Sequence, residues 1–179
     1  SYYSFHLPAK TDRVKGVTAI ILKDTPGEKL LPRMEKREGK DWIGLRIRNE
    51  GKVTDLYINQ LADGRLMHSN SWIEADGWQT DAYMFAVTYE ESTDAADSKD
   101  FFICHGSALR RGEVSYFSSL SKLFVIRKEE NKKLNLLIEG QPKIYATFGN
   151  MKRPVALEVN GKVLPVDYEH EAVKVKAQK

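Results

Sequence analysis

The sequence predicts an all-β protein, an antiparallel β-sandwich of about a dozen short strands with little or no helix. Apolar and polar residues alternate with a period of two in most of the apolar runs, as in strands. Turn sequences rich in Gly, Asn, Asp and Pro separate these runs, and no segment keeps a helical period of 3.6. Short strands spaced in this way are typical of a sandwich.

Length and composition indicate a single domain over residues 1–179. The net charge of +3, from 28 basic and 25 acidic residues, is too balanced to favour a nucleic-acid partner. No apolar run reaches the roughly 20 residues of a membrane-spanning helix, so no membrane partner is expected. The chain opens directly on strand-like residues without a signal peptide, and we expect a fragment or C-terminal part of a larger protein.

Two strands are predicted before the middle of the chain. Residues 16–23 are rich in β-formers and end at a Thr-Pro-Gly turn, in which Pro presets φ and Gly permits the reversal. Residues 42–48 alternate Ile and Leu with Trp42, Gly44, Arg46 and Arg48, so the second face is solvated or faces a ligand.

The stretch 53–89 places two strand-like runs around a cluster of polar and aromatic residues. Turns are predicted at residues 62–64 and 76–77, and the cluster contains Arg65, His68, Trp72, Asp76 and Trp78. Indole rings beside carboxylates and Arg are typical of sugar-binding clefts. An equally weighted interpretation is that both Trp side chains close the end of the sandwich core.

The following segment contains an acidic loop and an arginine pair. Five acids lie between Glu90 and Asp100, and we expect an exposed loop there rather than a calcium site, because the spacing matches no EF-hand. After a buried strand at 101–105, two glycines frame Arg110 and Arg111 in a predicted loop. Such a pair suits a carboxylate or sulfate, although ordinary surface charge is the alternative.

The last third is predicted to be a meander of strands at residues 114–120, 122–128, 133–140 and 143–149. Asn160-Gly161, between alternating runs at 155–159 and 164–168, is a strong hairpin signal. A final strand at 172–177 turns Lys174 and Lys176 outwards, as expected near a sheet edge.

No catalytic, metal-binding or cofactor-binding motif is present. The sequence lacks a nucleophile elbow, a P-loop and the metal-ligand pairs H-E-x-x-H and C-x-x-C, so no catalytic residue, metal or cofactor is assigned. The single Cys104 lies in an apolar run and is expected to be a buried small hydrophobe. His68 and His105 are the histidines nearest to the polar clusters, and we expect hydrogen-bonding roles for them rather than base catalysis.

Two runs resemble a known family. The sequences YINQLADGRLMHSNSWIEADGWQTDAY (57–83) and HGSALRRGEVSYFSSLSKLFVIRK (105–128) are similar to the C-terminal β-sandwich region of bacterial heparinase II/III-like polysaccharide lyases. The resemblance extends over residues 42–166. It implies a sandwich that packs on an upstream helical catalytic domain, an acidic polysaccharide as partner, and a periplasmic or secreted location.

The resemblance carries no catalytic residue to this chain. In these lyases an α/α-toroid supplies an Asn or His and a Tyr for β-elimination, and the sandwich adds a further His. This sequence has no toroid, and His68 does not stand in the His-rich context of the family's sandwich.

The first functional expectation is therefore a non-catalytic sandwich that lines or supports the cleft of a lyase acting on acidic glycans. The alternatives are an autonomous carbohydrate-binding module, using the two Trp and the two Arg residues, and a structural or protein-docking sandwich. Solvent exposure of Trp72 and Trp78 discriminates among them, because a purely structural sandwich predicts that both are buried.

Overall fold

The structure is a computed structural model that describes residues 15, 31–63, 71–98 and 100–178. The strand-like residues at the start of the chain, the strand predicted at 16–23 and the predicted site residues Arg65 and His68 lie outside this part of the chain. The described part is nearly all β, which confirms the predicted class, with one short 3-10 helix, η1 (Ala95–Asp97). No helix in it is long and apolar enough to cross a membrane.

The strands are distributed over the whole described chain. They are β1 (Arg33–Gly39), β2 (Trp42–Asn49), β3 (Lys52–Asn59), β4 (Ile73–Ala75), β5 (Trp78–Thr80), β6 (Met84–Glu90), β7 (Asp100–Arg111), β8 (Val114–Glu130), β9 (Lys133–Glu139), β10 (Lys143–Phe148), β11 (Ala156–Val159), β12 (Lys162–Leu164), β13 (Asp167–Glu169) and β14 (Ala172–Gln178).

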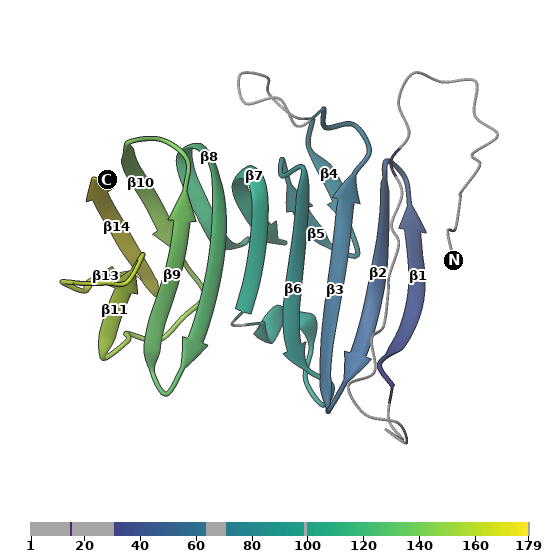
Figure 1. The fold of residues 1–179 in the computed structure, drawn as a ribbon, viewed down its shortest axis with the longest axis horizontal. Helices are drawn as coiled ribbons and strands as arrows, with labels where there is room; N and C mark the ends of the chain where they lie inside the picture. The colour runs from purple at the N-terminus through teal and green to yellow at the C-terminus, as the bar shows by residue number, and fades with distance from the viewer. Residues whose placement is uncertain (1–14, 16–30, 64–70, 99, 179) are drawn as a thin grey trace, which may run out of the picture.

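All these strands belong to one hydrogen-bonded sheet that branches at β7 and β8. The first half of β7 and the second half of β8 continue the order β1-β2-β3-β6 towards β9, β11 and β12, which we call the first subsheet. The other halves of β7 and β8 join β4 and β5 to β10, β14 and β13, which we call the second subsheet. In Figure 1, β4 and β5 are seen behind β3 and β6.

An irregularity in β7 separates the two subsheets. His105 has a positive φ of 54°, and the β7–β8 register shifts between Ile103 and Gly106 and again before Ala108. A Cβ on Gly106 would lie 2.7 Å from the Cβ of Ala82, so the chain can pass Ala82 only because position 106 has no side chain. Bulges of this kind bend a strand and change the direction of its side chains.

One continuous core joins the two subsheets. Phe101 of the first subsheet lies 6.4 Å from Phe117 and 6.3 Å from Phe148 of the second, measured between ring centroids. Tyr57 and Phe85 stack at 4.7 Å within the first subsheet. Burial of these rings supplies much of the driving force for folding, because aromatic side chains remove large apolar areas from water.

Several elements differ from the sequence prediction. Residues 106–111 are strand rather than loop, because Gly106 occupies the bulge and β7 continues through it. The runs 114–120 and 122–128 form the single strand β8. The β9–β11 pair is parallel, so the sheet is mixed rather than purely antiparallel. The predicted hairpin at Asn160-Gly161 is confirmed, since it joins β11 to β12.

β1 was not predicted from the sequence, because most of its residues are charged. The described residues of the acidic segment are mostly exposed, as predicted, and they include the short 3-10 helix η1. β1 pairs along its full length with β2, although its sequence RMEKREG shows no apolar face, as is common at sheet edges. Between Glu90 and Asp100, the Asp94 side chain accepts a hydrogen bond from the Ala96 amide and caps η1.

Candidate ligand-binding face

The short hairpin β4–β5 positions most of the predicted site residues against the end of β7. Trp78 is opposite Arg111, and Gln79 is opposite Arg110. Directly opposed residues share a face of the sheet, and successive residues alternate between faces. The two arginines therefore point to opposite sides, and the predicted cluster separates into an exposed outer face and a buried inner face.

The outer face presents an exposed Trp–Arg pair. The Trp72 side chain is 51% exposed, and the Arg110 guanidinium carbon lies 5.8 Å from the centroid of its ring. Glu74 and Gln79, also exposed, occupy adjacent positions of the same face. This arrangement offers an apolar ring, a permanent cation with directional N–H donors, and neutral and acidic hydrogen-bonding groups to a ligand.

The inner face uses Trp78 and Arg111 for packing. Trp78 is fully buried, its ring contacts Tyr116 edge-on at 4.8 Å, and Arg111 lies 5.2 Å above it. The Arg111 guanidinium donates to the Asp76 carbonyl at 2.8 Å and lies 3.7 Å from the Asp94 carboxylate. The core-closing interpretation is therefore confirmed for Trp78 and wrong for Trp72.

Asp76 lies in the β4–β5 turn, and its carboxylate is hydrogen-bonded to other side chains of the protein. Its φ of 50° and that of Gly77, 83°, produce the predicted tight turn. Its carboxylate accepts hydrogen bonds from the Tyr57 hydroxyl at 2.8 Å and from Arg37 at 2.9 Å. Burial, followed by the neighbouring Asp55 charge, raises the pKa of Tyr57 far above its ordinary value, so this phenol remains a donor. Asp76 thus serves the turn rather than a ligand.

A second charged network on β2 and β3 was not assigned from the sequence. Arg46 binds the buried carboxylate of Asp55 through two hydrogen bonds, at 2.6 and 2.8 Å, and the Tyr89 hydroxyl donates to the same group at 2.9 Å. The hydrogen bonds to Asp55 raise the pKa of Arg46, so this guanidinium stays charged. The sequence could have indicated this network, because Arg46 and Asp55 have opposite charges and occupy facing positions of the neighbouring strands β2 and β3.

The histidines in the described part do not join the Trp72–Arg110 pair. His105 is buried in the β7 bulge, with its ring 6.2 Å from Phe124. His170 is largely exposed beside Glu169 at the other end of the second subsheet. Among the described residues no group of three or more His, Cys, Asp or Glu side chains is arranged to hold a metal ion.

Comparison with known proteins gives no independent assignment. No protein-family model matches the chain, and no curated protein sequence matches it. The resemblance to the sandwich of heparinase II/III-like lyases thus stays a prediction from the sequence.

Proposed function

We propose that this chain is the non-catalytic β-domain of a polysaccharide-degrading enzyme and binds acidic glycans through Trp72 and Arg110. The observation that carries the proposal is the exposed indole of Trp72 with the Arg110 guanidinium 5.8 Å from it. An indole face packs against the C–H face of a sugar ring, and a guanidinium binds carboxylate or sulfate oxygens through paired donors. Acidic sugars supply both features in one ligand.

The residues around Trp72 and Arg110 supply further groups for binding a sugar. Gln79, opposite Arg110, supplies amide groups for neutral hydroxyls, and the neighbouring Glu74 can accept from them. In this proposal an upstream helical domain of an exported lyase performs the chemistry, and the β-domain lines or supports the cleft. An autonomous binding module would use the same residues, and it differs only in working without that domain.

The test compares two arginines that are adjacent in sequence. Arg110→Lys retains the charge but removes the planar pair of donors, and we expect it to weaken binding of a chondroitin sulfate octasaccharide by about 1–2 kcal/mol. Arg111→Lys should leave the affinity nearly unchanged, because Arg111 is engaged with Asp76 and lies over Trp78. Isothermal titration calorimetry at two salt concentrations measures both, and the loss should shrink at higher salt.

Two controls complete this experiment. A neutral cello-octaose should bind more weakly than the acidic octasaccharide, and incubation with acidic polysaccharides should release no unsaturated uronate, followed by absorbance. Equal effects of the two Arg substitutions would show that Arg110 is ordinary surface charge. Steady release of unsaturated product by this chain would overturn the non-catalytic assignment.

A further inference from the structure

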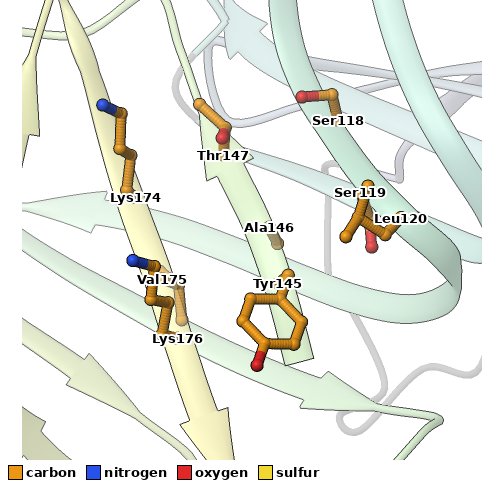
Figure 2. Close-up of a pocket in the computed structure, with 9 residues that line it drawn as sticks. All are labelled: Ser118, Ser119, Leu120, Tyr145, Ala146, Thr147, Lys174, Val175 and Lys176. Carbon is orange, nitrogen blue, oxygen red and sulfur yellow. The ribbon is translucent and has the colours of Figure 1, made fainter. Parts of the chain in front are cut away.

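A pocket lies on the second subsheet, away from the Trp72–Arg110 pair. It has a volume of about 280 Å³ and is formed by β8, β10 and β14, and we call it the β10 pocket. Figure 2 shows its lining residues. They are Ser118, Ser119, Leu120, Tyr145, Ala146, Thr147, Lys174, Val175 and Lys176.

The polar side chains of the β10 pocket share a face of the sheet with Arg110. Ala108 is two residues before Arg110 on β7 and is opposite Ser118 on β8. Ser118 is opposite Thr147, which is in turn opposite Lys174. The register shift between Leu109 and Arg110 places the extra residue on β8, so β7 itself alternates regularly from Ala108 to Arg110. Because directly opposed residues point to the same side, Arg110, Thr147 and Lys174 belong to one face of the sheet, on which Ala108 is buried.

The chemistry of the β10 pocket matches that of the first pair. Tyr145 is 46% exposed and stands directly opposite Lys176. The Lys174 ammonium is hydrogen-bonded to Glu169, whereas Lys176 has no ion pair with any described residue. The pocket therefore combines an aromatic ring, hydroxyl groups and an available cation. In Figure 2 the side chains of Lys174 and Lys176 extend from β14.

The spacing between the two sites sets the size of a ligand that reaches both. β7 and β14 are separated by β8 and β10 in the sheet. With strands about 4.8 Å apart, Arg110 and Lys176 are separated by roughly 14 Å across the strands, in addition to their offset along them. A disaccharide is too short for this distance, whereas an octasaccharide can contact both sites.

We infer that the β10 pocket is a second subsite for an anionic sugar, so that one acidic glycan chain lies across β5, β7, β8, β10 and β14. The inference takes its ligand class from the proposed function, but the pocket can be tested separately. Two weak sites on one polymer strengthen each other, because binding at the first raises the effective concentration of the chain at the second.

The experiment uses this chain with a chondroitin sulfate disaccharide and octasaccharide, followed by calorimetry. Lys176→Gln and Tyr145→Ala should each weaken octasaccharide binding about threefold to fivefold, in the range of an exposed charged or stacking contact. Lys133→Gln is the matched control, since Lys133 is an exposed strand lysine of β9 in the first subsheet. It should leave the affinity unchanged.

A substitution with the opposite effect sharpens the test. Glu169→Gln removes the carboxylate that holds the Lys174 ammonium. Lys174 then becomes available to the ligand, and octasaccharide affinity should increase about twofold. An unchanged thermal midpoint in each variant shows that altered binding does not reflect unfolding.

The outcomes separate the two proposals. If Lys176→Gln, Tyr145→Ala and Glu169→Gln all leave octasaccharide affinity unchanged while Trp72→Ala weakens it, the second subsite is overturned and the proposed function stands. If Trp72→Ala has no effect and Lys176→Gln weakens binding, the subsite is supported and the assignment of Trp72 is wrong. Binding of single-stranded DNA as tight as that of the octasaccharide, and equally sensitive to Lys176→Gln, would overturn the glycan assignment.

Discussion

Neighbouring residues of the same type have different surroundings in β5, β7 and the segment before β4. Trp72 and Trp78 are separated by only a few residues, yet one is half exposed and the other fully buried. Arg110 and Arg111 are adjacent, yet only Arg111 is held by Asp76 and lies over the buried indole. Alternation along β7 explains the difference between the arginines, because each step of one residue reverses the side-chain direction. The β4–β5 register explains the difference between the Trp residues, because Trp78 is opposite Ala75 on the buried face, whereas Trp72 precedes Glu74 by two residues on the exposed face.

The two Trp residues should consequently differ in their effect on stability. Trp78→Ala leaves a cavity under Arg111 and beside Tyr116, and we expect the free energy of unfolding to fall by about 3–5 kcal/mol. Trp72→Ala should change it by no more than about 0.5 kcal/mol, since this side chain is half exposed and lies outside the core. Urea denaturation followed by circular dichroism measures both, and similar losses would contradict the assignment of Trp72 to a ligand-binding face.

At the scale of single elements, the β11–β12 turn stabilises the neighbouring strand β9. Asn160 has a φ of 51°, as the two-residue turn requires. Its side chain accepts from the Ile138 amide at 2.7 Å and donates to the Ile138 carbonyl at 2.9 Å. The amide thereby continues the parallel β9–β11 ladder, whose last backbone pair is Leu136 and Val159. This turn fixes the edge of the first subsheet.

Asn160→Gly isolates this contribution, because Gly accepts the positive φ but has no side-chain amide. We expect a loss of about 1–3 kcal/mol in the free energy of unfolding, since two backbone groups of buried Ile138 lose their partner. Asn131→Gly is the matched control, at a φ of 50° in the exposed β8–β9 turn. Equal stabilities of the two variants in urea denaturation would show that Asn160 contributes only its turn conformation.

At the scale of the whole molecule, burial couples stability to alkaline pH. Burial is the main cause that raises the pKa values of Tyr57, Tyr89, Tyr116 and Cys104. These groups lose protons more readily in the unfolded chain than in the native protein. Their contribution to stability is complete below the ordinary pKa values and is lost as the pH rises above them. Lys122, whose pKa burial lowers, acts in the opposite direction.

The Tyr57→Phe variant isolates one of these phenols. Below the ordinary Tyr pKa of 10.0, the difference in unfolding free energy between the wild type and Tyr57→Phe should be constant. Above this pH it should decrease, because the Tyr57 hydroxyl ionises only after unfolding. Urea denaturation between pH 8 and pH 11 would follow it. A difference that grows with pH would contradict the assignment of Tyr57 as a protonated donor to Asp76.

Local sequence was sufficient for the class and for many of the elements. The period-two runs identified β2, β3, β6, β9, β10 and β14, because strand alternation depends on neighbouring residues. Asp76-Gly77 and Asn160-Gly161 identified the β4–β5 and β11–β12 turns, because positive φ is also a local property. The charged strand β1 was not recognised, since its pairing with β2 stabilises it without an apolar face.

The sequence by itself thus determined an all-β chain and the residue types available for a polar, aromatic site. Only the tertiary structure decided which members of that site face solvent, because this depends on the direction in which β7 crosses from one subsheet to the other. The bulge at His105 and the close approach of Gly106 to Ala82 set that direction. Contacts between residues far apart in sequence then buried Trp78 and Arg111 and left Trp72 and Arg110 exposed, since burial follows from packing between strands rather than from local pattern.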